Sequence, residues 1–458
     1  MKEFVHLHLH SQYSLLDSTI KLPELFEWLK SHGMNACAIT DHGHLLGAAD
    51  FYFLAKEHGI KPIIGCEFFV APESRLDRDL RRDEHHHLVL LAMNRTGYEN
   101  LMHLATSAYL EGYYYVPRID KALLEERNEG LVCLSGCARG EIPSLVIRGE
   151  KGRLQQTVEW YRSVFESRFF LELQDHALAQ QAVINRRLIR EAARHQIPVV
   201  ATNNCHYIGR DHAGAQRVLS NIGRLRQPHG ADGNLHESDE LYVKSPAQME
   251  EAFSDNREAL WNSLRISEMC NVALTEQANH TRQGSGNDNS PHENEKMNED
   301  VVHSHQLLFE TGEIDVPAPG SLGALQCMKN KYGDEHFANT PKFSYLRSKK
   351  LLTEMAKALS IPRPTIEAVL RGGAPSSIRE TVERDPSTQK RDEPELARVV
   401  SVIDGLPDAV LTRTDLFVVS EIPLKMMIPL YRGPGGERVT QYTSIHLKRM
   451  GIGQHKRG

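Results

Sequence analysis

The sequence predicts an α/β protein whose first 200 residues or so form a closed or nearly closed parallel barrel. Residues 4–207 alternate short apolar runs with amphipathic stretches, in about seven strand–helix repeats. That many repeats in so short a span favour a barrel over an open sheet. Histidine is abundant, with 24 in 458 residues, and barrels of this kind carry their chemistry at the C-terminal ends of their strands.

Short apolar runs bounded by polar or turn residues predict the strands. They lie at 4–10, 35–41, 61–70, 87–93, 130–135, 168–173 and 197–203. Amphipathic spacing predicts the helices between them. These lie at 22–32, 46–58, 97–108, 151–166 and 178–195.

The first strand alternates apolar residues with histidine. A period of two places His6, His8 and His10 on one face. Imidazole is the commonest metal ligand, so this face can hold one ion or bridge two. A strand with a merely solvated polar face explains an isolated His-x-His pair equally well.

Further residues able to bind a metal follow the later strands, which favours a site. They are Asp41, His42, Glu67, Cys137, Asn203, Asn204 and His206. His87 is the exception, because it begins its strand. Taken singly, each has an ordinary structural role; together they suit two or three zinc or manganese ions that activate water for phosphoester hydrolysis.

The composition indicates where the protein is located and which partners it can bind. The chain is 40% hydrophobic and 25% charged, and its net charge of -6 gives no global attraction for nucleic acid, so any DNA contact must be local. Seven cysteines form no disulfide or zinc-ribbon pattern. There is neither an 18-residue apolar run nor a leader peptide, so we expect a cytoplasmic protein without a membrane partner.

Several motifs occur in order along the first half. They are His8-Leu9-His10, Ser14-Leu15-Leu16-Asp17, Thr40-Asp41-His42-Gly43, Gly65-Cys66-Glu67, His87-Leu88-Val89-Leu90, Leu134-Ser135-Gly136-Cys137, Ala201-Thr202-Asn203, His206-Tyr207 and Glu237-Ser238-Asp239-Glu240-Leu241-Tyr242. Residues 3–274 thereby resemble the PHP domain of the bacterial DNA polymerase III alpha family, a PHP-type seven-stranded parallel α/β barrel. The resemblance implies a metal site that holds two to three ions of Zn²⁺ or Mn²⁺. Nine positions of the chain would supply its ligands.

Those positions fall on His8, His10, Asp17, His42, Glu67, His87, Cys137, Asn204 and His206. We assign the catalytic role to Asp17 and His42. Asn204 departs from the family, whose active members carry aspartate there. A neutral amide is a weaker ligand and cannot offset cation charge.

The second half is expected to be separate from the PHP domain at 1–274. Residues 275–306 are polar and predict a disordered linker. Residues 307–458 resemble, in patches at 331–362 and 395–450, a partial and degenerate α+β polymerase palm. The intervening 363–394 is expected to be mobile, and the residues assigned to DNA contact are Arg347 and Lys349.

The carboxylates for two-metal nucleotidyl transfer are missing from the matched positions. The family's Asp-x-Asp run falls on Thr311 and Glu313, with Asp315 beyond it, and its later aspartate falls on Lys456. A lysine at this position would repel Mg²⁺. We therefore expect Mg²⁺ as a cofactor only if polymerase activity persists.

Three hypotheses remain. One is a metal-dependent phosphoesterase, such as a 3′-5′ exonuclease acting on DNA ends. Another is a subunit of a DNA-directed DNA polymerase, which is the activity that the family resemblance implies. Its partners would be DNA and other subunits of the replication complex. The third is a non-catalytic scaffold module, which has no physical need for so many coordinating side chains.

We predict that this chain does not synthesise DNA, because Thr311 and Lys456 replace metal-binding carboxylates. The measurement is extension of a primed template with Mg²⁺ and deoxynucleotides. The prediction is wrong if the wild type extends the primer and Asp315→Ala abolishes this extension. The second half would then be a working polymerase.

Overall fold

The computed structural model describes most of the first half of the chain and parts of the second. The described residues are 3–79, 85–226, 238–274, 334–346, 354, 399, 401–419, 424, 428–433, 437–449 and 455–456. Outside them lie the predicted linker 275–306, the segment 363–394, the DNA-contact residues Arg347 and Lys349, and the positions Thr311, Glu313 and Asp315.

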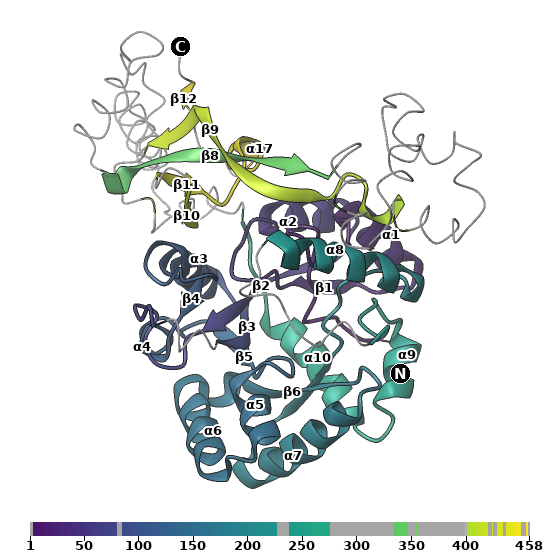
Figure 1. Cartoon of the computed structure of the whole chain (residues 1–458). Coiled ribbons are helices and arrows are strands. Elements are labelled where there is room, and N and C mark those ends of the chain that lie inside the picture. Colours follow the sequence, from purple (N-terminus) through teal and green to yellow (C-terminus); the bar gives the residue numbers. More distant parts are fainter. Residues whose placement is uncertain are drawn as a thin grey trace, which may run out of the picture.

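Seven short strands of the N-terminal unit (described residues 3–274) form one curled sheet (Figure 1). They are β1 (Ala36–Ile39), β2 (Lys61–Val70), β3 (His86–Ala92), β4 (Arg118–Ile119), β5 (Leu131–Leu134), β6 (Phe169–Gln174) and β7 (Val199–Thr202). Their order is β1-β2-β3-β5-β6-β7, with β4 paired to β2. The predicted α/β class with a barrel-like, mainly parallel sheet is confirmed.

One strand departs from the expected all-parallel arrangement. β3 runs antiparallel to both β2 and β5, whereas the pairs β1–β2, β2–β4, β5–β6 and β6–β7 are parallel. A parallel neighbour needs a crossover connection, normally a helix, and the described part of the β2–β3 connection contains none. The start of β3 therefore lies at the rim where β2 ends, since His87 pairs with Phe69.

The predicted first strand, 4–10, is extended but does not form a regular strand. It makes single parallel bridges from His6 to Cys37 and from Leu9 to Cys205. Backbone hydrogen bonds run to β1 from one side and to Cys205 from the other, including Ala38 N–H to His6 O (2.8 Å) and His10 N–H to Cys205 O (2.9 Å). The segment thus lies between the two edge strands of the sheet.

Helices cover the outside of this sheet (Figure 1). They are α1 (Leu22–Ser31), α2 (Ala48–Glu57), α3 (Arg95–Leu110), α4 (Lys121–Glu126), α5 (Glu141–Arg148), α6 (Lys151–Phe165), α7 (Ala179–His195), α8 (Ala213–Arg226), α9 (Pro246–Ala252) and α10 (Arg257–Met269). Their apolar faces pack on the strands; in α1, for example, Leu22, Leu25, Phe26 and Leu29 are buried. Searching the described residues reveals no helix long and apolar enough to cross a membrane.

A second sheet, the C-terminal sheet, lies over α2 and α3 (Figure 1). Its strands are ordered β10-β11-β8-β9-β12. They are β8 (Phe337–Tyr345), β9 (Pro407–Val419), β10 (Leu430–Arg432), β11 (Arg438–Thr440) and β12 (His455–Lys456), with the short helix α17 (Ser444–Arg449). Lys456, where the family pattern has a catalytic aspartate, pairs through β12 with Leu416 of β9.

Specific hydrogen bonds hold the C-terminal sheet to the N-terminal unit. The Leu45 N–H donates to Gln441 Oε1 (2.6 Å), and the Leu430 N–H donates to Thr106 Oγ1 (3.0 Å). The buried hydroxyls of Tyr98 and Tyr442 also hydrogen-bond. Buried polar contacts of this kind fix one arrangement, since leaving either partner unpaired is costly.

The turn at Gly136 places Cys137 and provides a test of the fold. Gly136 has φ +82°, and an added Cβ would lie 2.4 Å from His87 O; Gly149 has φ +71°, with nothing within 4 Å. We expect Gly149→Ala to cost about 1 kcal/mol from backbone strain alone. Gly136→Ala should cost at least about 1 kcal/mol more from the added clash.

The measurement is the shift in urea midpoint of both variants against wild type. Equal shifts would show that the loop after β5 yields freely and that this turn does not fix Cys137.

Candidate metal centre

The centre of the candidate site is the carboxylate of Glu67, which is fully buried on β2. Four imidazoles face its two oxygens. The distances are 3.1 Å from His8 Nε2, 3.4 Å from His10 Nε2, 2.9 Å from His42 Nδ1 and 3.1 Å from His87 Nδ1. Three other segments of the chain, carrying His8 and His10, His42, and His87, thus meet at one side chain.

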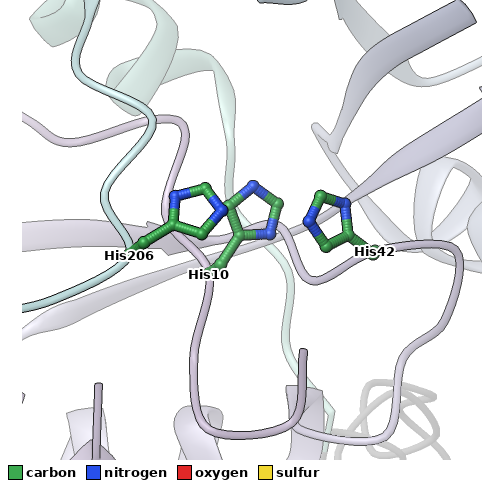
Figure 2. Close-up of side chains that lie close together, drawn as sticks. All are labelled: His10, His42 and His206. Carbon is green, nitrogen blue, oxygen red and sulfur yellow. The ribbon is translucent and has the colours of Figure 1, made fainter. Parts of the chain in front are cut away.

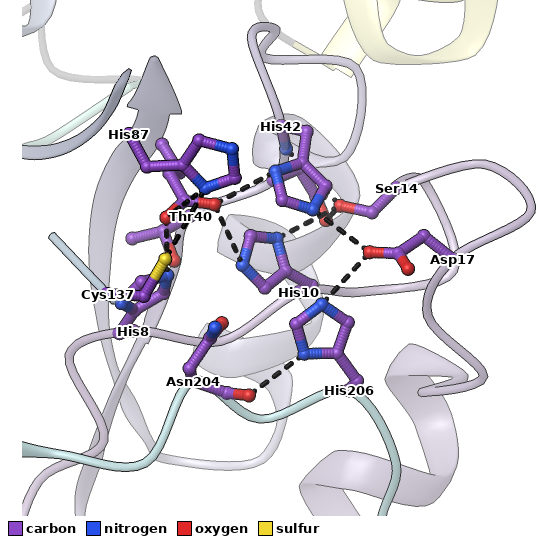
Figure 3. Close-up of polar contacts among 12 residues, drawn as sticks. His8, His10, Ser14, Asp17, Thr40, His42, His87, Cys137, Asn204 and His206 are labelled. Carbon is purple, nitrogen blue, oxygen red and sulfur yellow. Dashed lines mark hydrogen bonds and ion pairs between the residues drawn. The ribbon is translucent and has the colours of Figure 1, made fainter. Parts of the chain in front are cut away.

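A second carboxylate, Asp17, lies at the outer edge of the cluster. Its Oδ2 is 2.9 Å from both His42 Nε2 and His206 Nε2 (Figure 3). The rings of His10, His42 and His206 lie together in Figure 2, with His10 stacked on His42 at 4.0 Å between centroids. Asp17 and His42 keep 18% and 14% side-chain exposure, whereas His10 and Glu67 have none.

The other two predicted ligands lie at the periphery. The Cys137 Sγ is 3.5 Å from His87 Nδ1. Asn204 has φ +45°, which asparagine tolerates better than most residues. Its backbone carbonyl accepts from His206 Nδ1 (2.9 Å), and its buried Oδ1 makes no hydrogen bond within the described part of the chain. All nine predicted ligand positions therefore lie in one region.

Other residues of the predicted rim have structural roles. Asp41 accepts hydrogen bonds from the Ser11 N–H (2.7 Å) and the Ser14 hydroxyl (2.7 Å) and so holds the loop that carries Asp17. Asn203 donates to the carbonyls of Glu240 and Tyr242. His6 does not join His8 and His10, because its Nε2 hydrogen-bonds the Lys244 carbonyl at 2.8 Å. The expected row of three imidazoles is therefore wrong for His6.

Sequence reasoning missed Glu172, which orients His8. The His8 Nδ1–H donates to Glu172 Oε1 (2.7 Å), leaving Nε2 directed at Glu67. Gln174 (2.7 Å) and Thr202 donate to the same oxygen. A carboxylate behind a ligating imidazole fixes its tautomer and raises its basicity. The sequence feature that could have indicated this role is that Glu172 is the single carboxylate in the apolar run Phe169–Leu173.

The electrostatics of the cluster favour a cation. Burial alone would raise the pKa of Glu67, but the facing imidazoles of His87, His8 and His42 hold it well below its usual range. Burial would lower the pKa of His8, yet the charges of Glu172 and Glu67 raise it to about 9. For His42, hydrogen bonds to Asp17 and Glu67 likewise outweigh burial and raise the pKa to about 10. The carboxylates thus attract positive charge to the cluster.

His10 and His87 behave in the opposite way. Burial and the neighbouring His42 and His206 keep the pKa of His10 well below its ordinary value. Burial lowers the pKa of His87 to about 4, in spite of Glu67. Neutral imidazole is the form that binds a metal.

These residues fit transition-metal ions. Three groups have donor atoms within 4.8 Å of one another: His10, His42 and His206; His8, His10 and Glu67; and His42, Glu67 and His87. Buried atoms that face the centre, including His8 Nε2, His10 Nε2 and both Glu67 oxygens, are paired within the described residues only through close contacts to one another, and none of these contacts has regular hydrogen-bond geometry. Mixed imidazole and carboxylate donors suit zinc or manganese.

Comparison with known families agrees with the fold. Residues 6–176 match the PHP domain family. Residues 313–453 match the family described as the bacterial DNA polymerase III alpha NTPase domain. The N-terminal unit is therefore a PHP domain. The chain as a whole is a relative of bacterial DNA polymerase III alpha subunits.

Individual relatives show how much of such a subunit is present. The DNA polymerase III subunit alpha of Borreliella burgdorferi is 29% identical over 545 residues, covering 98% of this chain and 48% of the relative. That of Treponema pallidum is 42% identical over 274 residues, covering 59% of this chain and 23% of the relative. This chain thus spans about half the length of the first relative.

Solved structures also resemble this chain, and one of them contains a PHP-like domain. It is a two-domain protein from Bacteroides vulgatus containing a predicted PHP-like metal-dependent phosphoesterase, 14% identical with a TM-score of 0.26, covering 44% of this chain and 52% of that chain.

We predict that the wild type binds on the order of two or three Zn²⁺ or Mn²⁺ ions and that the His8→Ala, His10→Ala double variant loses most of them. Both imidazoles face Glu67, so their loss removes donors from the centre. Elemental analysis of the purified proteins is the measurement. His58→Ala is the control, because His58 pairs with Glu27 outside the cluster. Equal and negligible metal in wild type and double variant would refute the assignment.

Proposed function

We propose that this chain is a metal-dependent phosphoesterase that acts as a 3′-5′ exonuclease on DNA ends, with Zn²⁺ or Mn²⁺ as cofactor. The observation that carries the proposal is Glu67 facing four imidazoles, with Asp17 between His42 and His206 at the edge of the cluster. Its relation to DNA polymerase III alpha subunits supports DNA as the substrate and other replication-complex subunits as partners.

The proposed metal ligands are His8, His10, Asp17, His42, Glu67, His87, Cys137, Asn204 and His206. Bound ions would activate water and stabilise charge on the phosphoryl oxygens. Asn204 adds no negative charge, so Glu67 and Asp17 supply the carboxylates of this set. The number of ions held is therefore most sensitive to these two residues.

Asp17 and His42 are the proposed catalytic residues, because both border the open cleft beside the cluster. Asp17 can accept a proton from the attacking water, and His42, in the protonated state in which it does not ligate an ion, can donate one to the leaving oxygen. Their 2.9 Å contact holds both groups at the same phosphate position.

The alternatives receive less support. A scaffold has no need for buried donors around one carboxylate, since burying charge is costly unless it is compensated. For DNA synthesis, the matched catalytic positions carry threonine and lysine at 311 and 456.

We predict that His42→Ala lowers hydrolysis by about 10²- to 10⁴-fold, the range for loss of a general acid or base. The assay follows shortening of a 5′-labelled single-stranded oligonucleotide with Mn²⁺ or Zn²⁺, alongside p-nitrophenyl phosphate. His58→Ala should match the wild type. If the metal-loaded wild type hydrolyses neither substrate, the proposed function is wrong.

A further inference from the structure

A cleft of about 810 Å³ opens beside the candidate metal centre, and both halves of the chain form its walls. Asp17 and His42 line it from the N-terminal unit, and Tyr431, Arg432 and Gln441 line it from the C-terminal sheet. Its volume is that of a site for a small ligand. It therefore suits a single nucleotide or a short single-stranded end.

Aromatic rings gather on one wall of this cleft. Tyr109 of α3 stacks on Tyr113 at 6.0 Å and meets Tyr431 of β10 edge-on at 6.0 Å. Tyr113 and Tyr115 keep 48% and 37% exposure, so their faces are accessible to a ligand. Rings exposed beside a charged site are suited to stacking on a nucleobase.

Two arginines line the same cleft, Arg224 from α8 and Arg432 from β10. Among the described lining residues, Asp17 is the only carboxylate. Guanidinium groups bind phosphate through paired hydrogen bonds. The cleft thus combines stacking surface with phosphate-binding groups, the two elements that single-stranded nucleic acid requires.

The hydroxyl of Tyr431 is a further, independent indication. Tyr431 is 8% exposed, and its Oη is buried with no hydrogen-bond partner among the residues described. A buried hydroxyl without a partner is costly. Because Tyr431 also lines the cleft, a ligand bound there is the partner that we propose for it. The strand that carries it is held in place, since the Leu430 N–H donates to Thr106 and the Leu430 carbonyl accepts from Gln441 Nε2 (3.0 Å).

We propose that β10 completes the substrate site of the PHP domain. Tyr431 Oη hydrogen-bonds the terminal nucleotide, Arg432 holds a phosphate, and Tyr113 stacks on the base. The polymerase-related half thereby becomes a specificity element of the phosphoesterase. This inference rests on the proposed function and assigns residues that the metal centre does not include.

The test uses the full chain and two substrates, a single-stranded oligonucleotide and the same oligonucleotide with an abasic 3′ end. Tyr113→Ala should lower kcat/KM roughly 10-fold on the ordinary end, the size of one lost stack, and leave the abasic end unchanged. Tyr431→Phe, which keeps the ring, should raise KM roughly 2- to 10-fold on both ends with kcat unchanged. Arg432→Gln should also raise KM on both ends.

Trp261→Ala is the control, because it removes an aromatic ring that is 60% exposed and does not line the cleft. Unchanged KM for Tyr431→Phe and Arg432→Gln, in an active enzyme, would overturn the role of β10 and leave the proposed function standing.

A wild type that hydrolyses neither end would instead refute the proposed function. Fluorescence anisotropy with an oligonucleotide carrying a 3′-terminal phosphorothioate linkage then decides whether the cleft binds DNA. Weaker binding by Tyr431→Phe and Arg432→Gln than by wild type would support the site, and equal binding by all three would refute it.

Discussion

The burial of the Glu67 carboxylate is the constraint on which the N-terminal unit depends. A buried carboxylate without compensation would neutralise or unfold its surroundings. Here four imidazoles from three separate segments face it at 2.9 to 3.4 Å. The fold therefore has to bring the ends of several strands to one point, and a divalent cation would compensate the same charge more strongly than protons on His8 and His42.

The antiparallel direction of β3 is one consequence. His87 begins its strand, and in an all-parallel barrel it would lie at the end opposite Glu67. Because β3 reverses direction between β2 and β5, the start of the strand lies at the same rim as the ends of its neighbours. The His87 Nδ1 then reaches Glu67 at 3.1 Å. A departure from regular barrel topology is thus what brings the fourth imidazole to Glu67.

Much of this could be predicted from the sequence, because apolar periodicity is local. Helices α1, α2, α3, α6 and α7 lie within a few residues of their predicted ranges. Strand direction was not predictable, since it depends on pairing between distant residues. Glu172 was missed for a similar reason: only the tertiary contact with His8 separates it from an ordinary strand carboxylate. The extended segment 4–10 has the alternation of a strand but only isolated bridges.

The contact between the two halves changes how the polymerase-related segment is understood. Residues of that segment pair closely with the PHP domain through buried hydrogen bonds. Gln441 accepts from the Leu45 N–H, and the same side chain donates to the Leu430 carbonyl of β10. One buried amide therefore fixes β10 relative to the loop that follows His42. A change in either half would move Tyr431 relative to Asp17, so the geometry of the cleft between them and the packing of the C-terminal sheet are physically coupled.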